Sequence, residues 1–199
     1  MRTVDPDKHR AKRRHIVHAA AGLFAARGYD GTTTAAICRA AGVSSGNLFH
    51  YFANKREIFA AIFSDGDDET SARLAAALVS EDPWAGLMDF VEHLAAPATE
   101  PVVPGLVLEA MLRAHRDPEL AQMLGDTAAD EEAGIAALLR RAADAGRIDP
   151  GVEPATAASW VMALIEALFL RAAVNDAFDA AEQMPTMRLV LERFLRPQR

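Results

Sequence analysis

Helical periodicity extends through the whole chain and limits its fold more than any other feature of the sequence. Apolar residues recur every three or four positions, as at Ile16, Ala20 and Phe24, while the alternating pattern of strands is nearly absent. The chain has 199 residues, of which 51% are hydrophobic, so a well-filled core is attainable. These features predict an all-α protein whose helices are separated by glycine and proline.

Charge is distributed unevenly along this chain. Residues 1–60 contain ten Lys/Arg against four Asp/Glu, a net charge of +6. Residues 61–199 contain eleven Arg against twenty-four Asp/Glu, a net charge of −13. A basic head on an acidic body indicates that only the head meets a polyanion, such as a nucleic acid. A chance excess of basic residues in an N-terminal tail is the plainer alternative.

Cysteine usage and hydropathy indicate the compartment. The single cysteine, Cys38, excludes a disulfide within the chain and fits a reducing environment. We expect no apolar run to reach the roughly 20 residues that cross a bilayer, and the charged N-terminus lacks the pattern of a signal peptide. The sequence therefore predicts a soluble cytoplasmic protein without a membrane partner.

The stretch GVSSGNLFHYFANK, residues 42–55, contains the turn and the second helix of a pair predicted at about 34–40 and 45–51. Two short helices joined by such a tight turn match a helix-turn-helix, whose second helix lies in the major groove of DNA. Leu48 and Phe52 have the spacing of an inner face. The outer face would then carry polar or flat side chains, namely Ser45, Asn47, His50 and Tyr51. An ordinary helical hairpin with aromatic core residues is the alternative.

Further polar residues lie where helix ends and the following turn would approach phosphates. They are Thr33, Thr34, Ser44, Tyr51 and Lys55. The side-chain amide of Asn47 is the type that pairs with an adenine edge. A basic N-terminal arm would add phosphate or minor-groove contacts, or form a solvated tail; its residues are Lys8, Arg10, Lys12, Arg13 and Arg14.

Residues of about 10–62 resemble the N-terminal domain of the tetracycline-repressor (TetR) family. The resemblance covers about a quarter of the chain. The matching residues, in order and spacing, are Ile16 through Phe24, Gly28-Tyr29, Thr33-Thr34, Ile37, Ala41-Gly42-Val43-Ser44, Gly46, Leu48-Phe49-His50-Tyr51-Phe52, Lys55 and Ile58. The resemblance implies an all-α homodimer that binds a palindromic operator in double-stranded DNA, usually as a repressor released by a small molecule.

By position, the resemblance implies phosphate contacts from Thr34, Tyr51 and Lys55. Base or groove contacts would come from Ser45, Gly46, Asn47 and His50. Phe49 stands where tyrosine is usual, so a hydroxyl contact to phosphate is missing and packing or a thymine-methyl contact remains. The complete set of predicted DNA-binding residues is Thr33, Thr34, Ser44, Ser45, Gly46, Asn47, Phe49, His50, Tyr51 and Lys55.

The predicted organisation has two domains. A helix-turn-helix domain with its basic arm occupies residues 1–53, and a helical ligand-binding and dimerisation domain occupies residues 54–199. A connecting helix near 54–78 is expected to act as a rigid rod. The last two helices carry a broad apolar band that suits a dimer bundle. The expected interface residues are Val161, Leu164, Ile165, Leu168, Val190, Leu191 and Phe194, with a core inside one chain as the alternative.

The middle helices are expected to hold a mostly apolar effector pocket. Its candidate residues are Trp84, Met88, Phe90, His93, Met111, Trp160, Met162, Glu166 and Phe169, and ordinary core packing is the alternative for each of them. The body has no cluster of basic residues that would suggest an acidic ligand. An apolar or aromatic effector is therefore the expectation.

Two rival functions remain. A di-metal enzyme would need Glu-x-x-His pairs, which the sequence lacks, and neither a glycine-rich phosphate loop nor a Gly-x-Ser-x-Gly elbow occurs. We therefore expect no enzyme activity, no catalytic residue, no metal and no cofactor. The other rival is a small-molecule-binding protein of the same fold without specific DNA binding. The sequence does not separate a repressor from an activator.

Overall fold

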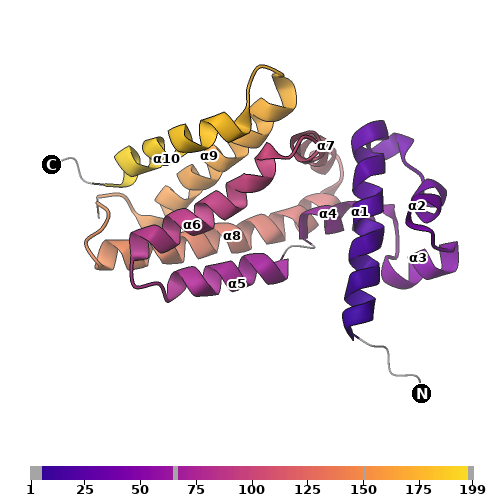
Figure 1. The fold of residues 1–199 in the computed structure, drawn as a ribbon, viewed down its shortest axis with the longest axis horizontal. Helices are drawn as coiled ribbons and strands as arrows, with labels where there is room; N and C mark the ends of the chain where they lie inside the picture. The colour runs from indigo at the N-terminus through magenta and orange to yellow at the C-terminus, as the bar shows by residue number, and fades with distance from the viewer. Residues whose placement is uncertain (1–5, 65–66, 150, 197–199) are drawn as a thin grey trace. The chain divides into compact units, whose positions relative to one another are not determined.

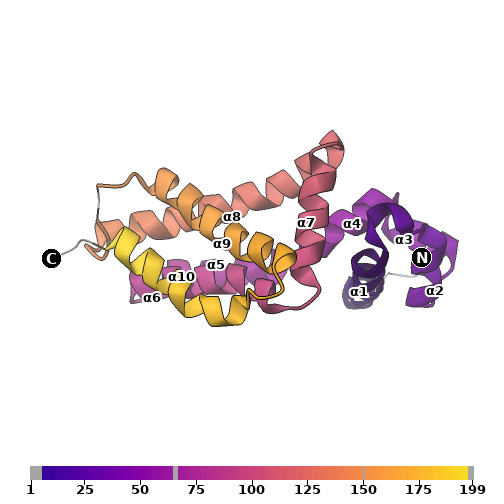
Figure 2. The same cartoon turned by 90° about the horizontal axis from the view of Figure 1, so that it is seen from above.

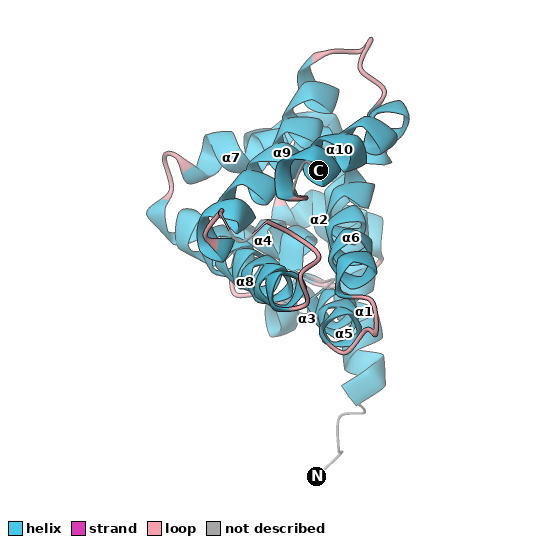
Figure 3. Ribbon diagram, turned by 90° about the vertical axis from the view of Figure 1, so that its left-hand side faces the viewer, coloured by secondary structure: helices cyan, strands magenta, loops and turns pink. Residues whose placement is uncertain are grey.

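The computed structural model describes residues 6–64, 67–149 and 151–196, and every regular element within these ranges is a helix (Figures 1 and 3). The predicted all-α fold is confirmed. In chain order the elements are α1 (Pro6–Gly31), α2 (Thr34–Ala41), α3 (Ser45–Tyr51), α4 (Lys55–Ser64), α5 (Asp67–Leu78), α6 (Pro83–Ala95), the 3-10 helix η1 (Ala96–Thr99), α7 (Val103–Ala114), α8 (Pro118–Asp144), α9 (Pro154–Val174) and α10 (Ala180–Leu195).

The helices form two compact units whose limits differ from the predicted division after residue 53. Unit 1 comprises Met1–Gly66 together with Glu109–Leu124, and unit 2 comprises Asp67–Leu108 together with Gly125–Arg199. The head extends beyond residue 53 because α4 packs on α1, where the Phe59 ring centroid lies 4.8 Å from that of Phe24.

The predicted connecting helix near residues 54–78 falls on two elements, α4, described as far as Ser64, and α5, described from Asp67. The residues between them, where a bend near Gly66 is expected, lie outside the described part of the chain. Two other helices are continuous across the boundary between the units. α7 enters unit 1 at Glu109, and α8 enters unit 2 at Gly125.

The core of unit 1 is built from the apolar stripe of α1 and the inner faces of α2, α3 and α4. Phe24, Leu48 and Phe59 are 0–1% exposed, and full burial of side chains of this size stabilises a fold by about 2 kcal/mol each. α1 bends at Gly28, whose φ of 67° is accessible to glycine at little cost. The hydroxyl of the buried Thr32 donates to the carbonyls of Leu23 and Gly28, so the bend leaves these groups paired.

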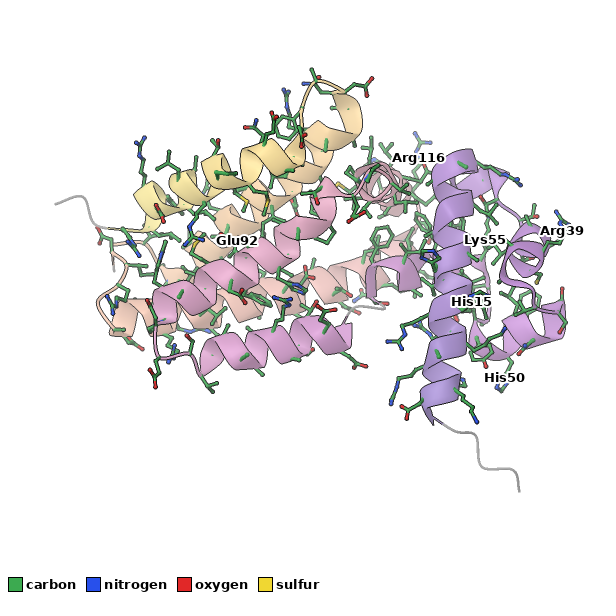
Figure 4. The ribbon with its side chains drawn as sticks, viewed as in Figure 1. His15, Arg39, His50, Lys55, Glu92 and Arg116 are labelled. Atoms are coloured by element: carbon green, nitrogen blue, oxygen red, sulfur yellow. The ribbon has the colours of Figure 1, made fainter. Side chains whose placement is uncertain are left out.

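The core of unit 2 lies between α6, α8, α9 and α10, and Figure 2 shows these long helices running alongside one another. Leu87, Phe90 and Ile135 are fully buried in it. α6 starts with Pro83 in its first turn, and the Asp82 carboxylate accepts hydrogen bonds from the first amides of the helix. Arg188 on α10 pairs with Glu92 on α6 (Figure 4).

Helix α9 is more apolar than the sequence analysis expected. Among the described helices it has the length and composition of a membrane span, with a mean hydropathy of 1.7, and 39% of the segment is buried in the protein. The expectation that no apolar run reaches such a length is therefore wrong. Val161, Ile165 and Leu168 explain part of this composition, because all three pack in the core of unit 2.

Candidate nucleic-acid interface

The turn between α2 and α3 has the geometry of a helix-turn-helix. Gly42 adopts a left-handed conformation with φ 60° and ψ 38°, which ends α2 within a single residue. The hydroxyl of Thr33 caps α2 by accepting from the amide of Ala36 at 3.2 Å, and that of Ser44 caps α3 by accepting from the amide of Asn47 at 3.2 Å. Both predicted DNA-binding hydroxyls thus also hold the two helices in place.

Helix α3 buries one side and leaves the other open. Leu48 is fully buried and Phe52 is 2% exposed, as expected for an inner face. The exposed residues of α3 are Ser45, Gly46, Asn47, Phe49 and His50, and Tyr51 is half-buried. Figure 4 shows His50 and Arg39 pointing outward from α3 and α2. This face is available to a partner, and its contacts with DNA stay a prediction.

The exposure of Phe49 separates it from the core aromatics. Its side chain is 50% exposed, although it neighbours the fully buried Leu48. An apolar ring in this position offers contact surface without a hydrogen-bonding group. A thymine methyl is the matching feature of the major groove.

Lys55 is held inside unit 1 (Figure 4). Its Nζ donates to the carbonyl of Tyr29 at 2.8 Å and to that of Thr32 at 2.9 Å, and it lies 4.2 Å from the centroid of the Tyr29 ring. Burial lowers the pKa of Lys55, and the nearby Asp30 carboxylate opposes this by raising it. The ammonium group therefore serves the end of α1, and its predicted phosphate contact competes with two internal bonds.

Tyr29 joins α1 to the end of α7. Its amide donates to Oε1 of Glu109 at 2.9 Å, and the Arg113 guanidinium lies 4.3 Å from the centroid of its ring. Arg113 also pairs with Asp30 at 2.8 Å. Burial raises the pKa of the Tyr29 hydroxyl, while Arg113 lowers it. These contacts attach residues 109–124 to α1 within unit 1.

A second link joins α4 to the start of α8. Nε of Arg56 lies 3.0 Å from Asp117, and the guanidinium also pairs with Glu119. The Arg56 and Asp117 side chains are 29% and 15% exposed, so water screens their pair less than a surface ion pair. Sequence analysis missed Glu109, Arg113 and Asp117, because their partners lie 60 to 85 residues away and no local pattern marks such pairs.

Unit 2 contains a cavity of about 120 Å³ among α5, α6 and α8. It is lined by two apolar side chains, Leu74 and Phe90, and five polar ones, Thr70, Ser71, Thr127, Asp130 and Glu131. Of the nine predicted pocket residues, Phe90 alone lines it. His93 is close by, since its Nε2 lies within hydrogen-bond distance of Thr70 Oγ1 at 3.1 Å. Burial lowers the pKa of His93, and Arg73 lowers it further.

The other predicted pocket residues are dispersed. Trp84 and Met88 are buried in the core of unit 2, while Met162 and Phe169 are half-buried against it. Met111, Trp160 and Glu166 are exposed, with Trp160 at 61%. Helical periodicity identified apolar side chains here, but it did not show which of them border an empty space.

The last two helices leave an apolar surface uncovered. We call it the α9–α10 face, and its exposed residues are Trp160, Leu170, Val174, Leu189, Val190 and Phe194. An open apolar groove of about 220 Å³ between the helices includes Leu164, Leu168 and Val190.

The predicted interface residues fall into two groups. Leu164 is half-buried, and Val190 and Phe194 are exposed, so these three remain available to a second chain. Four others are core residues of unit 2 and are 0–6% exposed, namely Val161, Ile165, Leu168 and Leu191. Their own chain covers most of the surface of these four side chains, although Leu168 still borders the groove, and their place in a dimer interface stays a prediction.

The next feature is the arrangement of possible metal-ligating side chains. Within the part of the chain that the structure describes, no group of three or more His, Cys, Asp or Glu side chains is arranged to hold a metal ion. Cys38 is buried as a free thiol.

The sequence matches two known protein families over most of its length. The family described as bacterial regulatory proteins, tetR family, matches residues 16–62. The family described as the C-terminal domain of BetI-type transcriptional repressors matches residues 83–196, which is more than half of the chain. The chain belongs to the TetR family. It is therefore a helix-turn-helix transcriptional regulator, and residues 16–62 match the family's DNA-binding domain.

Relatives and solved structures agree with this assignment. The HTH-type transcriptional repressor Rv1474c of Mycobacterium tuberculosis is 29% identical over 182 residues, covering 88% of this chain and 90% of that protein. Salmonella enterica GusR is similar in structure, with a TM-score of 0.71 and 26% identity, covering 92% of this chain and 96% of GusR.

A third TetR-fold protein was solved with a ligand. FadR of Bacillus subtilis, in complex with stearoyl-CoA, has a TM-score of 0.77 and 19% identity, covering 89% of this chain and 96% of FadR. At this identity the similarity shows the shared fold alone. The tetR match starts at Ile16, so the first part of α1, from Pro6 to His15, lies outside it.

Proposed function

We propose that this TetR-family regulator binds a palindromic operator as a homodimer, represses transcription, and is released by a small molecule. The open face of α3 supports the proposal most directly, because polar and flat side chains stand outward over a fully buried Leu48. Base contacts are assigned to Ser45, Gly46, Asn47 and His50, and phosphate contacts to Thr34 and Tyr51. The repressor name of the Mycobacterium tuberculosis relative favours repression over activation.

The homodimer is proposed from the α9–α10 face. A palindromic operator requires two recognition helices related by a two-fold axis. Monomeric proteins rarely expose large contiguous apolar patches, and this face includes Trp160 at 61% and Val174 at 60% exposure. A second copy of the same face would cover these side chains in an isologous interface.

The effector is proposed to bind in the cavity of unit 2. A volume of about 120 Å³ is below that of pockets for drug-sized ligands, so it suits only a ligand of a few non-hydrogen atoms, and Phe90 and Leu74 provide an apolar wall. Three hydroxyl and two carboxylate side chains would orient polar groups of the ligand beside that wall. The stearoyl-CoA of the FadR neighbour is much larger than this cavity.

Release is proposed to pass through α8. Thr127, Asp130 and Glu131 line the cavity, and the same continuous helix begins at Pro118 within unit 1. Its first turn is tied to α4 through the Arg56 ion pairs. An effector that binds one position of α8 better than another would shift the orientation of the head, by coupling free energies of roughly 1–3 kcal/mol.

Two further properties follow from this role. We infer that the protein works in the cytoplasm, where bacterial operators are accessible, and that it catalyses no reaction. The surviving alternative is a small-molecule-binding member of the family that has lost specific DNA binding.

Enrichment of genomic DNA tests the proposal directly. Purified protein is incubated with fragmented DNA from its source at moderate salt, and the retained fragments are sequenced. The proposal expects one palindromic sequence to be enriched. If folded, ligand-free protein retains no such sequence, the proposal is wrong and the family member without DNA binding is favoured.

A further inference from the structure

The first turns of α1 reach the end of the recognition helix. The ring centroid of His9 lies 4.6 Å from that of Tyr51, with the two ring planes tilted by 40°, and 6.0 Å from that of His50 in an edge-on arrangement. His50 and Tyr51 also contact each other edge-on at 5.3 Å. The three rings form a cluster in which one member comes from α1 and two come from α3.

A second contact follows one helical turn later. The guanidinium of Arg13 lies 4.9 Å from the centroid of the Phe52 ring. His9 and Arg13 are four residues apart and therefore share one face of α1. That face meets three consecutive residues at the end of α3, namely His50, Tyr51 and Phe52. The basic segment expected to be an arm or a tail is thus, from Pro6 onward, a helix packed beside α3.

We propose that His9 is a positioning residue for DNA recognition, acting through the rings of Tyr51 and His50. α3 has only seven residues, and a helix this short has little stability of its own. A ring held against Tyr51 restricts its side-chain rotation before DNA arrives, and so reduces the entropy lost on binding. This role rests on the proposed function, because it needs α3 to read DNA.

The proposed positioning role of His9 does not depend on the charges around it. Asp7 and Arg10 pair with each other at 2.6 Å on the exposed side of the helix. The ring contact requires a flat side chain and no particular charge. Phenylalanine is therefore expected to replace histidine, whereas glutamine and alanine are not.

Operator binding by four variants tests this role. Fluorescence anisotropy of full-length protein is measured with the enriched palindrome and with a scrambled duplex, over a series of salt concentrations. His9→Ala and His9→Gln should each bind the palindrome roughly tenfold more weakly, with the same salt dependence. The scrambled duplex should lose less affinity, because it shares the proposed Tyr51 phosphate contact but not the proposed His50 base contact. His9→Phe should restore wild-type affinity. His18→Ala is the matched control, since His18 is an exposed histidine on the same helix.

Several outcomes would overturn the role. A smaller salt slope in all His9 variants, His9→Phe included, would mean that the imidazole touches phosphate directly. Equal losses on both duplexes, or an equal loss in His18→Ala, would mean that α1 acts without positioning α3. Wild-type protein that does not prefer the palindrome would reject the proposed function itself, and this role with it.

Discussion

Two surfaces of this regulator expose side chains of opposite chemistry. On α3, the exposed residues include Asn47 and His50, which can pair with base edges and phosphates. On α9 and α10, the exposed residues include Leu170, Val174 and Val190, which have no polar group for such a partner. From this difference we infer that each unit exposes a surface suited to a different kind of partner. Unit 1 is suited to a polyanion, and unit 2 is suited to another apolar protein surface.

Among the predictions, a charged substitution on the α9–α10 face should have the largest effect, and that effect is on dimer affinity. In Val190→Asp each subunit of the proposed dimer would bury a carboxylate, which costs several kcal/mol when unpaired. We expect dimer affinity to fall about a hundredfold, and operator affinity to fall with it. Light scattering after size-exclusion chromatography gives the mass at each concentration.

Val79→Asp is the matched control for this change. Val79 is 78% exposed and does not belong to the α9–α10 face, so its substitution should leave the dimer intact. A dimer that survives Val190→Asp, or that both substitutions weaken equally, would place the association of the two chains elsewhere.

The polar surface is tested at Asn47. Asn47→Ala removes the amide proposed to pair with an adenine edge, so discrimination at one base pair of each half-site should fall by roughly 1–3 kcal/mol. Competition between operators that differ at single positions measures this loss. Unchanged discrimination at every position would show that Asn47 does not read a base.

A substitution of Lys55 tests whether this side chain belongs to the DNA-contacting surface or only to the interior of unit 1. Lys55→Ala leaves the carbonyls of Tyr29 and Thr32 without their charged donor, and we expect the free energy of unfolding to fall by about 1–3 kcal/mol. Denaturant titration measures it. Salt titration of operator binding by the same variant provides the discriminating result. A slope lower by about one unit would show a phosphate contact as well, and an unchanged slope would confine Lys55 to the interior.

The smallest effect is expected from protonation of His93 in unit 2. Burial lowers its pKa in the folded protein, so the unfolded chain binds the proton more readily. The free energy of unfolding should therefore be at its full value above about pH 6.5, the ordinary pKa of histidine. It should decline as the pH falls below that value. Thermal unfolding of His93→Gln should depend less on pH over this range than that of the wild type. Equal pH dependence in both proteins would assign the decline to other groups.

Local patterns were sufficient where structure depends on near neighbours in the chain. Gly42, Thr33 and Ser44 were expected at helix ends, and the structure places them there. Leu48 and Phe52 were expected on the inner face of α3, and both are buried. Caps and i, i+4 contacts act within one or two helical turns, so the sequence itself shows them.

Sequence patterns did not predict the contacts that helices make with residues far away in the chain. α9 is apolar on most of its surface, so periodicity could not show that Val161 faces the core while Trp160 faces outward. Lys55 was assigned to phosphate because nothing near it in sequence marks the carbonyl of Tyr29 as its partner. The cavity of unit 2 was missed for the same reason, since its walls come from three separate helices.

The sequence by itself determined that this protein is all helical, that its head carries a helix-turn-helix, and that the head resembles TetR regulators. Each of these properties follows from residue spacing over short distances or from a local motif. The tertiary structure alone decided that residues 109–124 join the head, that His9 contacts Tyr51, and that a cavity lies among α5, α6 and α8. These depend on which faces pack together, and packing joins residues whose separation in the chain carries no periodic signal.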